Sequence, residues 1–456
     1  MAFWLKDRWP RHQSVSAFRP QHWKNGLRLQ TIHQARGRMQ LKTILNLVYR
    51  QPRFVYGRIE LIRQTPPTLQ VEVQPKKGSR AACSGCKKER PGYDTLEKRK
   101  FDFIPFWGIA VVFLYAMRRV DCPQCGVKVE EVPWATGKSP LTNAYAYFLA
   151  AWAKRMSWLE VAKAFKTSWD TVFRAVAIVV RWGLAHRCLD GVKSIGVDEV
   201  LWQRGYKFLT VVYQIDKGCC RLLWVGQERT VKTLLRFFHE FGRERARALE
   251  YVCSDMWKPY LKVIAKKAGQ AIHILDRFHI MAKMNKAIDE VRAKEVKELK
   301  ARGLGQVLKG ARWTLLKRPE NRTKAQEVKL SELVRYNLRA VRSYLLREEF
   351  QLFWTYVSPL WAGRFLDRWC AKVMRSKLEP MKKVARTLRN HRTLILNWFR
   401  AKGMVSSGTV EGMNNKLKVI TRRAFGFRTF QAVEIALYHT LGGLPDPGAQ
   451  LTHRFY

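Results

Sequence analysis

The sequence predicts a multidomain protein in which small α+β domains precede an α/β domain and a long helical segment. Three observations support this fold class. Two C-x-x-C pairs occur early in the chain, where no long helical pattern is present. Short apolar runs alternate with amphipathic segments over residues 193–276, as in an α/β domain. About 130 basic, strand-poor residues of helical periodicity then follow.

The composition points to a polyanionic partner. The 456 residues are enough for two to four domains, each with its own core. They include 85 Lys and Arg against 36 Asp and Glu, a formal charge of +49, which far exceeds what solubility requires. Because the basic residues run through the whole chain, we expect an extended nucleic-acid track. The 47% hydrophobic content argues against a disordered or ribosomal-type basic protein.

The sequence contains no segment typical of secretion or membrane insertion. Its start lacks the apolar core of a signal peptide, and no run of 18 or more apolar residues occurs. The longest candidate, residues 104–117, is flanked by charges and is predicted to be a buried strand pair. We therefore expect a cytoplasmic protein without membrane contact, in a reducing compartment.

Two cysteine pairs predict a structural zinc site. Cys83 and Cys86 form one C-x-x-C knuckle, and Cys122 and Cys125 form another, so four sulfurs can surround one Zn²⁺. The 35 residues between the pairs exceed the usual spacing, but their apolar run can form a hairpin between the knuckles. The alternatives are unliganded cysteines or, with less support from the surrounding pattern, a redox pair.

The helical segment after Leu141 contains a candidate helix-turn-helix. Residues 157–165 and 169–176 have the spacing of two short helices joined by a tight turn, and Ser168 can cap the second helix. An ordinary helical hairpin has the same pattern. If the motif binds DNA, the residues near the exposed start of the recognition helix are Lys166, Thr167, Trp169 and Arg174.

Two predicted strands each carry an acid at the carboxyl end. Asp198 ends SIGVDEV and Asp255 ends EYVCSD, at the edge where open α/β sheets bind ligands. Carboxylate oxygens are the ligands that Mg²⁺ prefers, and two-metal phosphodiester chemistry needs several acids. Glu199 and Asp276 compete for the same roles. Asp276 with His279 can supply a supporting partner or an extra ligand.

A third acid begins a basic helix near the end of the chain. Glu411 follows the turn at residues 405–409 and opens the segment VEGMNNKLKVITRR. An acid followed by basic side chains on one helix suits a site that binds both metal and phosphate. The residues expected to lie along a DNA backbone are Lys416, Lys418, Arg422 and Arg423.

Taken in order, these motifs resemble the DDE-type bacterial insertion-sequence transposases of the ISL-three group, over about residues 39–445. The resemblance implies a ribonuclease-H-like catalytic fold with an all-helical insertion. It also implies that Asp198, Asp255 and Glu411 are the catalytic triad and hold two Mg²⁺ or Mn²⁺ ions. It is carried by the paired C-x-x-C ribbon, the helix-turn-helix, Gly196-Val-Asp198-Glu199, Ser254-Asp255-Met256, Asp276-Arg-Phe-His279 and Val410-Glu411-Gly412-Met-Asn414-Asn415-Lys416-Leu-Lys418.

The resemblance and the composition together predict seven segments. They are a basic arm at 1–38 that we expect to be poorly ordered, a zinc-ribbon DNA-binding domain at 39–135, a helix-turn-helix domain at 141–190, the first part of the catalytic domain at 191–280, a helical insertion at 281–404, the second part of the catalytic domain at 405–445 and a tail at 446–456.

The implied function is that of a nucleoid-associated bacterial transposase. It would bind the terminal inverted repeats of its element and cut and join DNA, with target DNA as the second substrate. Pairing of two ends implies a homodimer or a higher oligomer. Two rival functions remain at this point: a catalytically inactive or regulatory DNA-binding protein derived from a transposase, and a repair or RNA-cleaving nuclease of the same fold.

Overall fold

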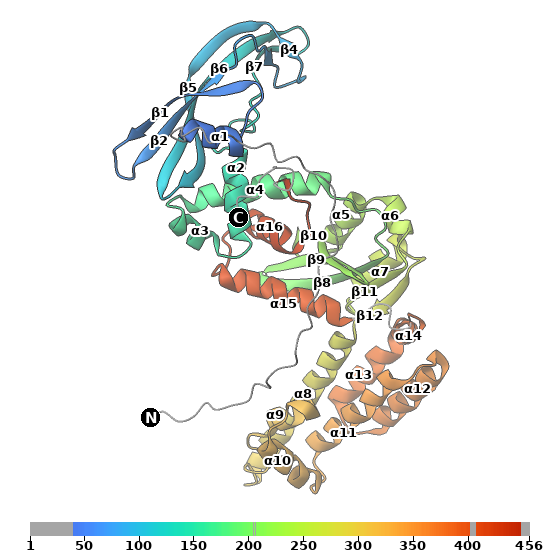
Figure 1. Ribbon diagram of the computed structural model, residues 1–456. Coiled ribbons are helices and arrows are strands. Elements are labelled where there is room, and N and C mark those ends of the chain that lie inside the picture. Colours follow the sequence, from blue (N-terminus) through green and yellow to red (C-terminus); the bar gives the residue numbers. More distant parts are fainter. Residues whose placement is uncertain (1–39, 204, 206, 402–406, 448–456) are drawn as a thin grey trace, which may run out of the picture. The chain divides into compact units, whose positions relative to one another are not determined.

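The computed structural model describes residues 40–203, 205, 207–401 and 407–447 (Figure 1). The chain divides into two compact units, Met1–Arg50 and Gln51–Tyr456. The first unit contributes one described helix, α1 (Leu41–Val48). The predicted arm at 1–38 lies outside the described residues, as do residues 448–456 of the predicted tail.

The second unit begins with a five-stranded sheet in the order β1-β2-β6-β5, with β7 paired to β6. Strands β2 and β6 run parallel, and the other neighbours are antiparallel. The apolar run at 104–117 closes the long β5–β6 hairpin, which confirms the predicted strand pair. The run is not buried throughout, because alternate residues of β6 are only half-buried and Trp107 at the turn is exposed. The strands are β1 (Phe54–Ile62), β2 (Thr68–Pro75), β5 (Gly92–Phe106), β6 (Ile109–Cys122), β7 (Gly126–Val129) and the short pair β3 (Ala81–Ala82) and β4 (Glu89–Arg90).

A buried charged network ties this sheet to the cysteine knuckles. The Glu130 carboxylate is almost fully buried and accepts hydrogen bonds from Tyr115 Oη (2.5 Å) and Arg118 Nη2 (2.8 Å). Burial of a carboxylate is tolerated when it is paired and hydrogen-bonded in this way. Because residue 130 also forms a β-bridge with Cys83, the network fixes one knuckle against β6.

Helical structure follows, as predicted for residues 141–188. The helices are α2 (Asn143–Ala153), α3 (Trp158–Ala164) and α4 (Trp169–His186). Small and β-branched residues on their inner faces pack into one core with the second sheet and with the last two helices, α15 (Ser407–Arg423) and α16 (Phe430–Leu441).

The second sheet has the order β10-β9-β8-β11-β12. The first three strands form antiparallel hairpins, whereas β11 and β12 run parallel to β8, which confirms the predicted α/β pattern. Its elements are β8 (Ser194–Gln203), β9 (Lys207–Asp216), β10 (Cys219–Gln227), α5 (Val231–Phe241), α6 (Arg243–Arg247), β11 (Tyr251–Ser254), α7 (Lys258–Lys267) and β12 (Ile272–Leu275).

Successive side chains of β8 face opposite sides of this sheet. Ile195 and Val197 join the core beneath α5 and α7. The intervening Gly196 faces α15 on the opposite side, where a Cβ atom would lie 2.5 Å from Val410 Cγ2. The sheet is therefore covered on both faces, and α15 lies against the strand that carries Asp198.

The interval between β12 and α15 is helical and has a core of its own, and no strand occurs among its described residues. This confirms the predicted strand-poor segment. No helix within the described ranges combines the length and apolarity that crossing a bilayer requires. The helices are α8 (Arg277–Ala301), α9 (Ala311–Leu316), η1 (Pro319–Asn321), α10 (Lys324–Val334), α11 (Arg339–Gln351), η2 (Leu352–Thr355), α12 (Pro359–Arg375), α13 (Glu379–Asn390) and α14 (Arg392–Arg400).

Candidate active site, zinc centre and DNA-binding surfaces

The second sheet brings three aspartates close to one histidine. Strand β11 pairs with β8 through Cys253 and Gly196, and with β12 through Ser254 and Leu275. Asp255 and Asp276 directly follow β11 and β12, and Asp198 lies two residues beyond Gly196. The charges of all three aspartates act on the pKa of His279, so the three carboxylates belong to one cluster.

Asp198 does not end its strand, contrary to the sequence-based expectation. It is in the middle of β8, which continues to Gln203 because β9 pairs with it over that whole length. Pairing with β11 stops at Gly196, two residues earlier. Asp198 therefore lies where β8 and β11 separate, and its side chain remains almost fully buried.

Helix α15 brings Glu411 to the same face of the sheet. Val410, its neighbour, packs against Gly196. One turn further along, the buried Asn414 donates from Nδ2 to Asp198 Oδ2 (2.5 Å) and accepts from Tyr213 Oη (2.9 Å). Residues three apart share a helix face, so Glu411 lies on the side of α15 that faces Asp198.

Arg229 links Asp255 to a further acid, Glu199. Its Nε donates to Glu199 Oε1 and its Nη2 to Asp255 Oδ2, both at 2.9 Å, and its guanidinium lies 4.5 Å from the ring centroid of Trp257. The second Asp255 oxygen accepts from the Trp257 backbone N–H (2.8 Å). Burial, and next the charge of Asp255, raise the pKa of Glu199 to about 8.

His279 lies among the aspartates from the first turn of α8. Its Nε2 is 3.5 Å from Asp198 Oδ1 and 3.9 Å from Asp276 Oδ2. Burial opposes its charged form, but the hydrogen bond and charge of Asp198, followed by the charges of Asp276 and Asp255, raise its pKa to about 9. Asp276 caps α8 by accepting from the Phe278 N–H (2.7 Å), and burial raises its pKa to about 6.

The donor set of this cluster fits a hard divalent cation. Buried carboxylate oxygens on rigid strands are the ligands that Mg²⁺ and Mn²⁺ take. Arg229 and His279 hold positive charge close to these acids. Within the described ranges, the acids do not form a set of three whose ligand oxygens all lie within 4.8 Å of one another.

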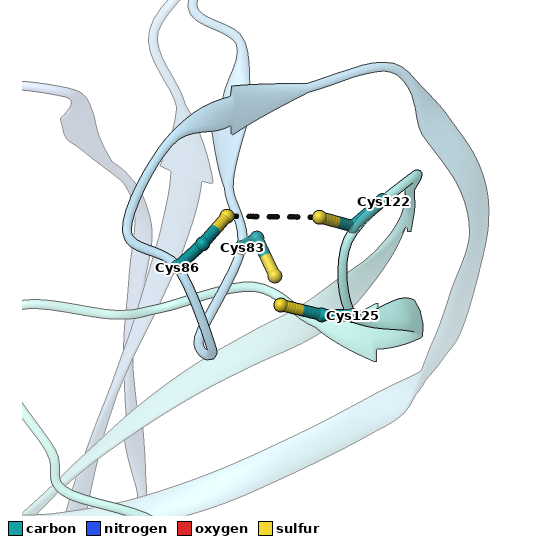
Figure 2. Close-up of side chains that lie close together, drawn as sticks. All are labelled: Cys83, Cys86, Cys122 and Cys125. Atoms are coloured by element: carbon teal, nitrogen blue, oxygen red, sulfur yellow. Dashed lines mark hydrogen bonds between the residues drawn. The ribbon is translucent and has the colours of Figure 1, made fainter.

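The four cysteines do form such a set. The sulfurs of Cys83, Cys86, Cys122 and Cys125 lie within 4.8 Å of one another and point toward a common centre (Figure 2). The distance from Cys86 Sγ to Cys122 Sγ is 3.6 Å. Tetrahedral Zn²⁺ with bonds of about 2.3 Å requires sulfurs roughly 3.8 Å apart, so the arrangement fits zinc.

Local backbone groups lower the pKa of two of the four thiols, Cys86 and Cys122, whereas burial raises the pKa of Cys125 to about 11. Burial on its own would raise the pKa of Cys122. Hydrogen bonds from the backbone N–H groups of Gln124 and Cys125 outweigh that effect and lower the pKa to about 6. The backbone N–H of Gly85 lies 3.4 Å from Cys83 Sγ. A Cβ at Gly85 would lie 2.9 Å from Cys125 Sγ, so only glycine fits between the knuckles.

The helix-turn-helix pattern corresponds to α3 and α4. Ser157 forms a capping box with Glu160, and the predicted cap Ser168 accepts from the Thr171 N–H (3.0 Å). The turn between the helices places Lys166 at φ +50°, and the Thr167 N–H bonds to Ala162 O, which is a Schellman ending of α3.

The side chains proposed for the recognition helix differ in solvent exposure and in the partners they already contact. Lys166 is exposed and Thr167 is half-buried. Trp169 is exposed but stacks on Phe173 with ring centroids 5.5 Å apart. Arg174 is exposed and forms an ion pair with Asp170 one turn earlier.

The basic side chains of α15 are open to solvent. Lys416, Lys418, Arg422 and Arg423 are all exposed, and none forms an ion pair with a described acid. The segment after α15 joins the helix-turn-helix, because Phe427 packs edge-on against Trp158 with centroids 5.8 Å apart. The two predicted DNA-binding elements are thus in contact.

Three residues of the acidic cluster were not among the predicted site residues: Arg229, Tyr213 and Asn414. Arg229 stands in the loop before α5 and Tyr213 in the middle of an apolar strand, where no local pattern marks them. Asn414 was quoted as part of a motif but without a role. Each acquires its role from contacts to residues distant in sequence.

Known transposases resemble this chain over most of its length. A model of the ISL3-type DDE transposases, described as "Transposase", matches residues 195–437. The chain is 30% identical over 401 residues to the transposase for insertion sequence element IS1557 of Mycobacterium tuberculosis, covering 81% of this chain and 88% of that protein. It is 28% identical over 379 residues to the transposase for IS1001 of Bordetella parapertussis, covering 82% and 92%. The chain therefore belongs to the ISL-three (ISL3) family of DDE transposases.

Proposed function

We propose that this transposase binds the terminal inverted repeats of its own insertion sequence and cleaves and joins DNA with two Mg²⁺ or Mn²⁺ ions at Asp198, Asp255 and Glu411. The observation that carries the proposal is the meeting of β8 and α15. Gly196 lets Val410 approach the strand, and Asn414 donates a hydrogen bond to Asp198, which supports a site shared by acids 213 residues apart in sequence. A ribonuclease-H-like arrangement is consistent with the observed strand order.

Asp198, Asp255 and Glu411 would hold the ions, and the ions, when bound, would supply activation of water or a 3′ hydroxyl and stabilisation of the leaving 3′ oxygen. Asn414 orients Asp198, and Arg229 orients Asp255. Asp276, Glu199 and His279 surround the acids as alternative or accessory groups.

The DNA strand has a candidate path beside Asp255. A cavity of about 430 Å³ is lined there by Arg229, Trp257, His279, Lys283 and Lys286. The two lysines are exposed on α8 and do not pair with a described acid. Cationic side chains at the mouth of an acidic site would hold phosphates that the acids alone would repel.

Recognition of the ends is assigned to three parts of the chain. The helix-turn-helix would read bases with Lys166, Thr167, Trp169 and Arg174. The exposed cations of α15 would bind the backbone, and the zinc ribbon would extend the contact. Pairing of two ends implies at least a homodimer, and the DNA substrate implies a place on the bacterial nucleoid. The seven segments predicted from the sequence are proposed here as the domains of this transposase.

The test is a cleavage assay on labelled DNA carrying the element's end. Wild type should cleave it with Mg²⁺, whereas Asp198→Asn, Asp255→Asn and Glu411→Gln should each bind it with unchanged affinity in EDTA but fail to cleave. Binding without metal-dependent cleavage by wild type would instead favour the DNA-binding regulator. Cleavage that ignores the end sequence would favour a nuclease.

A further inference from the structure

A second, larger cavity has Glu411 in its lining. Its volume is about 730 Å³, in the range of roughly 300–1,000 Å³ in which proteins bind small organic molecules. Its walls come from the start of α8, the α9–η1 segment, the end of α11, α14 and the start of α15. Because Glu411 is part of the lining, a molecule bound here is next to the proposed reaction centre.

Two aromatic side chains line the cavity. Phe278 is 45% exposed, although it is large and apolar. Its backbone is fixed by the hydrogen bond to Asp276, so the ring is held at the edge of the acidic cluster. The second is Trp398 of α14. Its ring packs edge-on against the ring of Trp354, with the two centroids 5.7 Å apart. Aromatic faces of this kind stack on nucleobases of any sequence.

The polar lining suits a phosphate and the edge of a base. Arg277 and Arg318 line the cavity, and neither forms an ion pair with a described acid. Arg347, by contrast, is held by Glu348 and by Asn285 Oδ1 (2.9 Å). The amides of Asn285 and Gln351 add donors and acceptors.

We propose that this cavity receives one unpaired nucleotide of the bound DNA end, with its base stacked on Phe278 or Trp398 and its phosphate held by Arg277 and Arg318. The inference rests on the proposed function, since it requires DNA at the acidic cluster. A base inside a duplex cannot enter a concave site, so the nucleotide must first leave the helical stack. Its neighbouring phosphodiester would then be presented at Glu411.

The experiment uses the full chain and a duplex that carries the element's end. The fluorescent base 2-aminopurine replaces one nucleotide at a time across the cleavage site, in EDTA so that no strand is cut. At one position, binding of wild type should change the fluorescence several-fold because the base leaves the stack. Phe278→Ala and Trp398→Leu should reduce or abolish the change.

Trp361→Ala is the matched control, since Trp361 is also a half-exposed tryptophan of the helical segment but lies outside the cavity lining. It should behave as wild type. Thermal melting identifies any variant that fails to fold. An abasic site at the responsive position should make wild type and Phe278→Ala bind DNA equally, because the base that distinguishes them is gone.

The outcomes separate this inference from the proposed function. Cleavage of the end by wild type in Mg²⁺, without a responsive 2-aminopurine position, would overturn the cavity assignment alone. The same holds if Phe278→Ala and Trp398→Leu, both folded, give the wild-type signal. Failure of wild type to bind or cleave the end would remove both proposals.

Discussion

At the residue scale, the acidic cluster depends on one amide. Asn414 connects the helix that carries Glu411 to the strand that carries Asp198, and it does so from a buried position. Replacing a residue that orients a metal ligand commonly lowers metal affinity or activity. The proposed site is therefore a property of the β8–α15 contact and not of three acids taken separately.

We predict that Asn414→Leu lowers the rate of end cleavage by about 10–100-fold, the range found when partners of metal ligands are removed. The reason is that Asp198 loses a donor and can rotate away from Glu411. Single-turnover cleavage at several Mg²⁺ concentrations measures it, and the concentration needed for half-maximal rate should rise. The adjacent, exposed Asn415→Leu is the control. Equal rates for the two variants would argue against the orienting role.

Gly196→Ala tests the close approach of α15. The new Cβ would lie 2.5 Å from Val410 Cγ2, and overpacking of this kind costs about 1–3 kcal/mol. We expect a lower melting temperature and slower cleavage. Adding Val410→Ala should restore part of both losses, because the two sites share one contact. Strictly additive losses in the double variant would contradict the packing described here.

The sequence offered Asp198 and Asp255 as candidate ligands because one interrupts and the other follows an apolar run, and the family pattern pointed to Glu411. Arg229 and Tyr213 were not predicted, since their partners are far away in the chain. The expectation that Asp198 ends its strand was wrong, because sequence periodicity does not reveal that β9 extends β8 beyond its contact with β11.

At the scale of elements, the two knuckles lie on either side of the β5–β6 hairpin in the sequence. Cys86 follows β3, and Cys122 ends β6. The spacing of the cysteines predicted the site, and the apolar run between them predicted the hairpin. The β1–β2 pairing and the buried Glu130 network had no counterpart in the sequence-based account, because both depend on tertiary neighbours.

The candidate zinc site formed by the four cysteines gives a prediction of its own. Wild type should contain one zinc per chain by elemental analysis, and Cys83→Ser should lose it and melt at a distinctly lower temperature, since structural zinc contributes directly to folding. Cys188→Ser, an exposed cysteine outside the cluster, should change neither. A Cys83→Ser variant with unchanged metal content and melting temperature would refute the assignment.

A substitution in the turn of the helix-turn-helix should affect stability and DNA binding differently. Lys166 adopts φ +50°, which costs a non-glycine residue about 1–2 kcal/mol. Lys166→Gly should therefore leave the free energy of unfolding unchanged or raise it, while weakening end binding because a cation is lost. Denaturant unfolding and fluorescence anisotropy measure the two quantities. Tighter binding by the variant would exclude a DNA contact at this turn.

At the scale of the whole molecule, the formal charge of +49 gains a structural context. Exposed cations occur on α8 beside Asp255, on α15 and at the start of α4, and the last two elements are joined through Phe427 and Trp158. Composition predicted a nucleic-acid partner but not these locations, because charge counts carry no spatial information.

Salt dependence tests the role of α15 in this surface. Each phosphate contact contributes about 0.9 to the slope of log binding constant against log salt concentration. Replacing Lys416 and Lys418 together by Gln should reduce that slope by roughly two units, for specific and nonspecific DNA alike. Replacing Lys377 and Lys382 of the helical segment is the control. An unchanged slope in the α15 variant would show that Lys416 and Lys418 do not contact DNA phosphates.

The central claim is that Asp198, Asp255 and Glu411 hold the catalytic ions together. Anomalous diffraction from Mn²⁺-soaked crystals of the complex with end DNA tests it most directly. We predict two manganese peaks about 4 Å apart, bound by oxygens of these three residues. Peaks bound by Asp276 or Glu199 without Glu411, or no peak at this edge of the sheet, would contradict the claim.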